Sequence, residues 1–199
     1  MISFQKRFLF VHIPKTGGNS IQSVLASHSE DKIVRRPGQD GVERFGVSNP
    51  KYNLKKHSPL AAYRAALGEE QFSRLYKFTC VRNPWDRMVS FYLTPGQGKQ
   101  WDRKAFKKTI LKALSATDYL RLEEGEPDPF GNVDRIIRFE NLAEEFNSVC
   151  ADLGIPPGSL PKYNRSERQD YSKYYDAELR ALVMERFAVE IARFGYTFD

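Results

Sequence analysis

The stretch FLFVHIPKTGGNS at residues 8–20 constrains the fold of this chain more than any other. An apolar run ends at Pro14, then come Lys15, a threonine and two glycines, and Ile21 opens an apolar pattern with helical spacing. This order predicts a buried strand, a short glycine loop and the start of a helix. Glycines let backbone N–H groups approach an anion, and a helix N-terminus adds unpaired donors and a favourable dipole. The segment therefore predicts a phosphate-binding loop, with Lys15 as its positive charge.

The order of residues in this loop separates it from two common phosphate loops. In G-x-x-x-x-G-K-[ST] the lysine follows the glycines and a hydroxyl for magnesium stands beside it. Here Lys15 precedes Gly17 and Gly18, and neither GK[ST] nor G-x-G-x-x-G occurs in the chain. Taken alone, the segment leaves open a second interpretation, a tight strand-to-helix turn with a solvated lysine.

A second motif, YKFTCVRNPWDRMVSFY at residues 76–92, has the same strand-to-helix organisation. Phe78–Val81 form a short apolar run typical of a buried parallel strand, and Arg82 follows it directly. Asn83 suits the N-cap of the next helix and Pro84 its first position. Since ligands of open α/β sheets lie beyond the carboxyl ends of the strands, Arg82 is expected at a ligand site.

Ser90 lies two turns along the same predicted helix and is expected to face the same anion as Arg82. The alternative is an ion pair between Arg82 and a carboxylate such as Asp86, with Ser90 an ordinary surface hydroxyl. Two phosphate-suited segments, each at the end of a strand, favour the functional interpretation.

These two motifs resemble those of PAPS-dependent sulfotransferases, where PAPS is 3′-phosphoadenosine 5′-phosphosulfate. HIPKTGGNS looks like their 5′-phosphosulfate loop and VRNPWDRMVSFY like their 3′-phosphate segment. The chain is most similar to the carbohydrate branch, which includes heparan sulfate 2-O-enzymes and many small bacterial proteins. The similarity extends through KKHSPLAAYRAALGEEQF, IIRFENLAEEF and YYDAELRALVMERFAVEIARFGYTF. One departure is Asn19, where this branch commonly carries threonine.

The resemblance implies transfer of a sulfuryl group from PAPS to an acceptor hydroxyl, on a carbohydrate, by in-line displacement without a metal. Lys15 is expected to stabilise the negative charge that develops on the bridging oxygen. Arg82, as a bidentate fork, and Ser90 are expected to hold the 3′-phosphate. Arg165 or Ser166 is expected to reach the 3′-phosphate or the adenine. The expected PAPS-binding residues are Lys15, Thr16, Gly17, Gly18, Asn19, Ser20, Arg82, Ser90, Arg165 and Ser166.

His57, in KKHSPL, is the expected general base, because a neutral imidazole can accept a hydroxyl proton. The heparan sulfate 2-O-enzymes are thought to use a histidine in the segment that KHS resembles. The alternatives are a polar loop role for His57 and Glu140 as the base, although FENL is more typical of a strand–helix corner. His12 is expected to be structural and His28 to lie on the surface.

Composition sets the broad class. The 199 residues suffice for one domain, residues 1–199, and a net charge of +6 suits an anionic cofactor and an anionic glycan acceptor. No nucleic-acid-binding signature accompanies that charge, and no metal-ligand cluster is visible. Cys80 and Cys150 are expected to be buried thiols. The basic residues Arg103, Lys104, Lys107 and Lys108 are interpreted as a solvated helix face rather than a glycan groove.

No run reaches the length of a membrane span, and the N-terminus lacks the segments of a signal peptide. If the chain is full length, we expect a cytoplasmic protein of bacterial type. Two rival functions stay open: a metal-dependent kinase, disfavoured by the missing GK[ST], and a non-catalytic binder of nucleotide phosphates or sulfated glycans.

Alternation of strands and helices predicts an α/β fold, a three-layer α/β/α arrangement around a central parallel sheet. Residues 29–56 are expected to form a loop with one short strand at IVRRP. The last helix is expected to place Leu179, Leu182, Val183, Phe187 and Ile191 on one core-facing stripe. The other predicted strands are 7–13, 77–82 and 133–139, and the other predicted helices are 18–28, 58–67, 84–93, 102–114 and 142–153.

Overall fold

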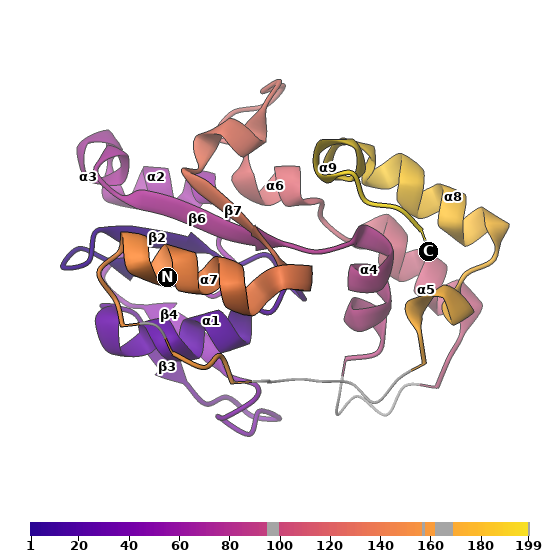
Figure 1. Cartoon of the computed structure of the whole chain (residues 1–199), viewed down its shortest axis with the longest axis horizontal. Helices are drawn as coiled ribbons and strands as arrows, with labels where there is room; N and C mark the ends of the chain where they lie inside the picture. Colours follow the sequence, from indigo (N-terminus) through magenta and orange to yellow (C-terminus); the bar gives the residue numbers. More distant parts are fainter. Residues whose placement is uncertain (95–99, 157, 162–168, 199) are drawn as a thin grey trace.

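A computed structural model describes residues 1–94, 100–156, 158–161 and 169–198, and a four-stranded sheet forms its centre (Figure 1). The strand order is β1-β2-β6-β7, with β2, β6 and β7 parallel and β1 antiparallel to β2. The three-layer α/β/α prediction is confirmed, with an antiparallel edge strand that was not predicted. The strands are β1 (Ile2–Ser3), β2 (Phe8–Val11), β6 (Tyr76–Val81) and β7 (Arg135–Arg138).

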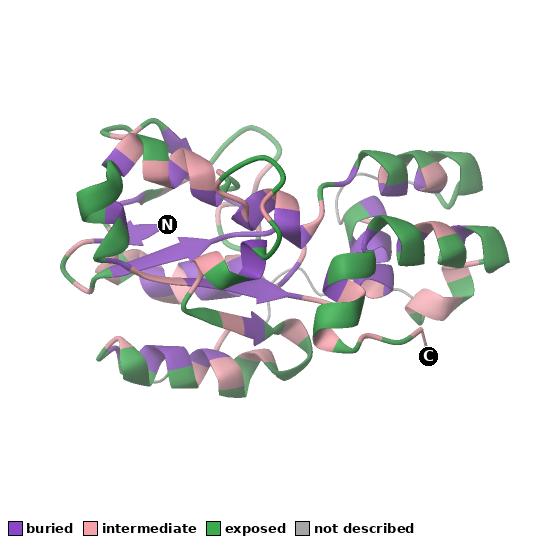
Figure 2. Ribbon diagram, turned by 90° about the horizontal axis from the view of Figure 1, so that it is seen from above, coloured by how far each residue is buried: buried purple, intermediate pink, exposed green. Residues whose placement is uncertain are grey.

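Helices cover both faces of this sheet (Figure 1). Because side chains alternate along a strand, Phe8 and Phe10 pack toward one layer while Leu9 and Val11 pack toward the other. Strands β1 and β2 and most of β6 are buried, the edge strand β7 is partly exposed, and the helices turn exposed sides outward (Figure 2). One layer holds α1 (Gly18–Leu25) and α7 (Leu142–Asp152), and the other holds α2 (Leu60–Leu67), α3 (Glu69–Ser73) and α6 (Ala116–Leu120).

A third apolar cluster lies beside the sheet, where β6 runs into α4 (Figure 1). It joins α4 (Pro84–Tyr92), α5 (Arg103–Lys112) and α8 (Ala177–Arg186). The prediction of one continuous C-terminal helix is wrong: Phe187, with φ −117° and ψ 25°, separates α8 from α9 (Ala188–Phe194). The break lets α8 pack on α5 while α9 packs on α6.

Residues 29–56 also differ from the predicted loop. They form a second, antiparallel sheet of three strands, and only β3 falls near the expected IVRRP strand. Phe45 and Val47 are buried against the α1–α7 layer, so long-range packing rather than local periodicity orders this segment. The strands are β3 (Lys32–Val34), β4 (Gly46–Asn49) and β5 (Leu54–Lys55).

Local chemistry accounts for two helix ends, of which the Asn83–Pro84 start of α4 was predicted. The Asn83 side chain accepts the N–H of Trp85 at 3.0 Å, and Pro84 begins α4. Gly68 ends α2 at φ +75°, a conformation that favours glycine. Short 3-10 turns are η1 (Ala26–His28), η2 (Pro129–Asn132), η3 (Phe139–Asn141) and η4 (Tyr171–Tyr174). No helix within the described ranges combines the length and apolar character needed to cross a membrane.

Candidate active site

The loop between β2 and α1 has an unusual backbone. Lys15 lies at φ +71° and Gly17 at φ +83°, both in the left-handed region. Glycine adopts this region readily, but a lysine there costs about 1–3 kcal/mol and is held by its surroundings. Such outliers concentrate at functional sites, which supports a specific role for the position of Lys15.

The paired glycines are required by close packing. A Cβ on Gly18 would lie 2.1 Å from the ring of His12, and a Cβ on Gly17 would lie 2.7 Å from Leu142. His12 is buried, and its Nδ1 lies 3.0 Å from Oε1 of Gln22, which agrees with the structural role predicted for it. The first turn of α1 can therefore approach both β2 and α7.

The polar residues of the loop are partly engaged in the loop itself. The Thr16 hydroxyl donates to the Ile13 carbonyl at 2.8 Å, and the Asn19 amide donates to the Glu43 carbonyl at 2.6 Å. The Ser20 N–H donates to the Gly17 carbonyl at 3.0 Å. The backbone N–H groups of Gly18 and Asn19, at the start of α1, are expected anion donors, and phosphate contacts from the side chains of Lys15, Thr16 and Asn19 stay predictions.

Arg82 joins the two predicted phosphate segments. Its Nη1 donates to the Lys15 carbonyl at 3.1 Å, although 67 residues separate them along the chain. Its Nε and Nη2 donate to Oδ2 of Asp86 at 2.8 and 2.5 Å, and its guanidinium lies 3.9 Å from the centre of the Phe139 ring. The predicted alternative, an Arg82–Asp86 ion pair, is therefore present. These contacts orient the guanidinium beside the phosphate loop.

Ser90 and Glu140 lie near the same end of the sheet. Ser90 is buried on α4, and its hydroxyl forms no hydrogen bond to another described residue. Glu140 accepts the Asn83 N–H at 2.8 Å and lies 3.3 Å from the Tyr196 hydroxyl, at the turn between β7 and α7. These bonds fit the strand–helix corner predicted for FENL and give Glu140 a structural task.

His57 lies against the phosphate loop, in contact with His12. Its Nδ1 lies 3.0 Å from the His12 carbonyl, and the two ring centres are 4.5 Å apart. Since a carbonyl only accepts, Nδ1 of His57 carries the proton and Nε2 keeps its lone pair. Desolvation and the charges of Lys56 and Lys15 lower the pKa of His57 to about 4, despite the opposing His12 bond. With a pKa near 4, the His57 imidazole is neutral at pH 7.

Lys56 was not predicted from the sequence to act together with Lys15, although the structure places it within reach of the Lys15 charge. Its Nζ donates to the Phe45 carbonyl at 2.6 Å and lies 4.3 Å from the centre of the Phe45 ring. Burial, then the charges of Lys15 and Arg36, lower the pKa of Lys56 to about 8. Three neighbouring cations repel one another, and an anion between them relieves that repulsion. In the sequence, only its position next to His57 in KKH could have indicated that Lys56 lies near the phosphate loop.

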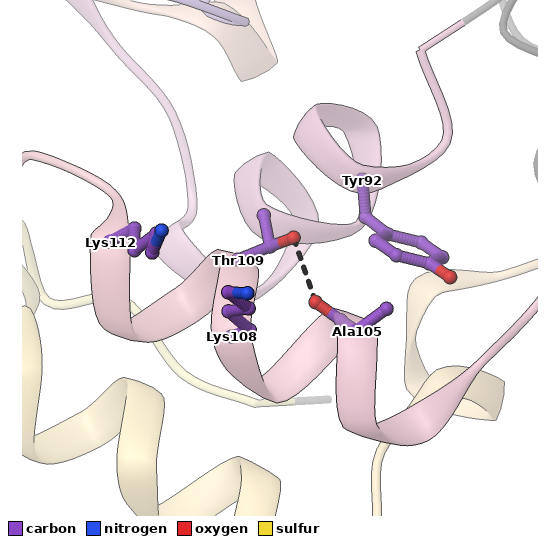
Figure 3. A pocket seen from close by; sticks show the side chains of 5 residues that line it. All are labelled: Tyr92, Ala105, Lys108, Thr109 and Lys112. Atoms are coloured by element: carbon purple, nitrogen blue, oxygen red, sulfur yellow. Dashed lines mark hydrogen bonds between the residues drawn. The ribbon is translucent and has the colours of Figure 1, made fainter.

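A hollow of about 390 Å³ lies elsewhere, between α4 and α5 (Figure 3). It contains no residue of the phosphate loop, so it is not the candidate site. Of the basic α5 residues, Arg103 pairs with Asp176 and Glu178 at the start of α8, and Lys107 pairs with Glu178. These ion pairs support the solvated-face interpretation. The hollow is lined by Tyr92, Ala105, Lys108, Thr109 and Lys112.

The two cysteines, the residues Arg165 and Ser166, and candidate metal ligands were also considered in the sequence. Cys80 and Cys150 are free and buried, as predicted. Arg165 and Ser166 lie outside the described residues. Within the part of the chain that the structure describes, no group of three or more His, Cys, Asp or Glu side chains could hold a metal ion.

A mostly parallel sheet with a lysine–glycine loop after one strand and an arginine after its neighbour defines a P-loop-like α/β fold. The sequence profile of the sulfotransferase family matches residues 1–128. The chain belongs to this family, as its two motifs predicted. The fold is similar to the crystal structure of mouse sulfotransferase SULT7A1 complexed with PAP, with a TM-score of 0.56, 17% identity, and coverage of 95% of this chain and 86% of that chain. At this identity the likeness concerns the fold. No curated protein matches the chain at a significant level.

Proposed function

We propose that this sulfotransferase moves the sulfuryl group of PAPS to a carbohydrate hydroxyl, with residues 1–199 acting as one domain. The observation that carries the proposal is the 3.1 Å bond from Arg82 to the Lys15 carbonyl. It brings a guanidinium and an ammonium-bearing loop to one edge of the sheet, which suits an adenosine with phosphates at two positions. The PAP bound to the mouse protein of similar fold is consistent with such a donor.

In this proposal each residue has a defined task. The first turn of α1 binds the 5′-phosphate, and Arg82 with Ser90 binds the 3′-phosphate. The acceptor oxygen forms a bond to sulfur while the bond from sulfur to the bridging phosphate oxygen breaks. Lys15 stabilises the charge that gathers on that bridging oxygen. Nε2 of His57 takes the acceptor proton, and the products are PAP and a sulfate ester.

The charges of Lys15 and Arg36 both act on Lys56 and help to lower its pKa. We propose that Lys56 contacts the phosphosulfate or an anionic acceptor. A carbohydrate acceptor is further supported by the resemblance of the two motifs to carbohydrate sulfotransferases. A cytoplasmic location stays a prediction that cell fractionation would test.

The first experiment measures binding by calorimetry, comparing PAP without metal against ADP with magnesium. We expect tight binding of PAP and weak binding of ADP, because only PAP carries the 3′-phosphate that Arg82 is proposed to bind. A preference for ADP with magnesium would favour a kinase and refute the proposal.

The second experiment follows transfer of labelled sulfate from PAPS to a panel of glycans and small alcohols. Lys15→Ala should abolish transfer with the fold intact, and His57→Ala should slow the chemical step more than it weakens PAP binding. PAP binding without any transfer to the panel would favour the non-catalytic binder. Normal turnover of Lys15→Ala would remove Lys15 from the mechanism.

A further inference from the structure

Arg87 is a buried charged residue of α4 that the tasks above do not use. It is 1% exposed, yet its Nε donates to the Pro14 carbonyl at 3.1 Å and its Nη2 to the Leu114 carbonyl at 2.8 Å. A guanidinium is expensive to bury, and replacing such a group by apolar residues often stabilises a protein. Stability alone is therefore a weak reason for an arginine at this place.

The contacts of Arg87 and Arg82 form a pair. Arg87 bonds the Pro14 carbonyl, and Arg82 bonds the Lys15 carbonyl, each at 3.1 Å. Both arginines come from the segment that ends β6 and forms α4. Between these two anchored carbonyls lies the left-handed backbone of Lys15, at φ +71°. A backbone in this region persists only when its surroundings hold it.

On its other side Arg87 lies near a buried carboxylate of α9. Its Nη1 lies 3.9 Å from Oε1 of Glu190, a carboxylate of α9 that is 2% exposed. The same Oε1 accepts the N–H of Ala116 at 3.4 Å. Burial raises the pKa of Glu190 to about 7, and the charge of Arg87 opposes that rise. Arg87 therefore links the phosphate loop to α9, and through Glu190 to the start of α6.

We propose that Arg87 is a positioning residue for sulfuryl transfer: by holding the Pro14 carbonyl it fixes the backbone of Lys15 and so the place of its ammonium. The inference rests on the proposed task of Lys15 at the bridging oxygen. The amides at the start of α1 are positioned separately, by the packing of Gly18 on His12. Loss of Arg87 therefore changes kcat more than it changes the affinity for PAP.

The test compares wild type with R87M/E190L, which removes both buried charges together and leaves neither unpaired. Active sites are counted by the stoichiometry of PAP binding in calorimetry, so that kcat is expressed per PAP-binding site. A displaced Lys15 lowers this kcat by about 10- to 100-fold, with the Kd for PAP changed by no more than about threefold. A merely structural role lowers the number of sites and leaves kcat per site unchanged.

R87K serves as a second variant, which tests the positioning role of Arg87 if the double variant does not fold. It keeps a positive charge opposite Glu190, but an ammonium lacks the planar fork that reaches two carbonyls. The matched control is R186M, because Arg186 also donates to a carbonyl of this cluster, that of Ala113 at 3.2 Å, without a contact to the loop. We expect lower kcat per site in R87K and a value within about twofold of wild type in R186M.

The outcomes separate the two proposals. Wild type without sulfate transfer refutes the proposed function, and hydrogen exchange of a peptide spanning residues 12–20 then tests the positioning role by itself. We expect faster exchange there in R87K than in R186M. Unchanged kcat per site in the folded Arg87 variants, or equal exchange in R87K and R186M, overturns the positioning role.

Discussion

Gly18→Ala gives the most direct test of how this site is packed. The added Cβ would lie 2.1 Å from Cδ2 and Nε2 of the His12 ring, whereas ordinary contacts begin near 3.4 Å. His12 has little room to withdraw, because it is buried, bonded to Gln22 at 3.0 Å and stacked on Phe10 at 5.8 Å. The substitution therefore has to displace the ring or the start of α1.

The magnitude follows from three contributions. Overpacking costs about 1–3 kcal/mol, loss of the buried His12–Gln22 bond costs about 1–3 kcal/mol, and the lower chain entropy of alanine returns about 0.4–1 kcal/mol. These contributions sum to about 1–6 kcal/mol, and we expect a net loss near the middle of that range, about 2–4 kcal/mol, in the free energy of unfolding. For a chain of this size that corresponds to a fall of roughly 4–16 °C in Tm.

The assay is thermal unfolding of wild type, Gly18→Ala and Gly158→Ala, each with and without PAP. Gly158 is the matched control, since its Cβ would meet nothing within 4 Å and its φ is not left-handed, so its Tm should stay within about 1–2 °C of wild type. PAP should raise Tm in wild type and Gly158→Ala but much less in Gly18→Ala, because the binding turn is displaced. If Gly18→Ala melts with the control and gains equally from PAP, the packing argument is wrong.

Two further predictions concern the chemistry. The kcat/KM of the free enzyme should form a plateau between two limbs: it falls as pH drops through about 4, where His57 gains a proton, and falls as pH rises through about 8, where Lys56 loses its charge. Lys56→Met should lower kcat/KM and abolish the alkaline limb, and a limb that persists in this variant would exclude Lys56 as its source. Ser90→Ala should weaken PAP about 10- to 100-fold in calorimetry, the value of a hydrogen bond to a charged group, with adenosine 5′-phosphosulfate unaffected. Equal losses for both ligands would show that Ser90 does not contact the 3′-phosphate.

Much of the central fold could be predicted because its signals are local. The run before Pro14, the glycine pair and the cap formed by Asn83 each depend on neighbours within a few residues. Such short-range preferences predicted β2, β6, β7 and the helices that follow them. The predicted first and last residues of these elements lie within three residues of the observed ones. The family followed from the same two segments, since each joins a strand, a loop and a helix start to the residues expected to bind phosphate.

Long-range packing decided the rest. Phe45 and Val47 order a three-stranded sheet where composition suggested a loop, and the break at Phe187 serves contacts of α9 with α6. His57 meets the His12 carbonyl 45 residues away, and Arg87 meets the Pro14 carbonyl 73 residues away.

The sequence alone therefore determined which residue types could bind a phosphosulfate and at which strand ends they stand. Only the tertiary structure decided that Arg82 pairs with Asp86 while bonding the loop, that Lys56 joins the cationic group, and that Gly18 must lack a side chain because His12 fills the space. The physical reason is that caps and periodicity act over one or two turns of chain. Burial, charge repulsion and steric exclusion arise only when segments that are distant in the sequence pack against one another.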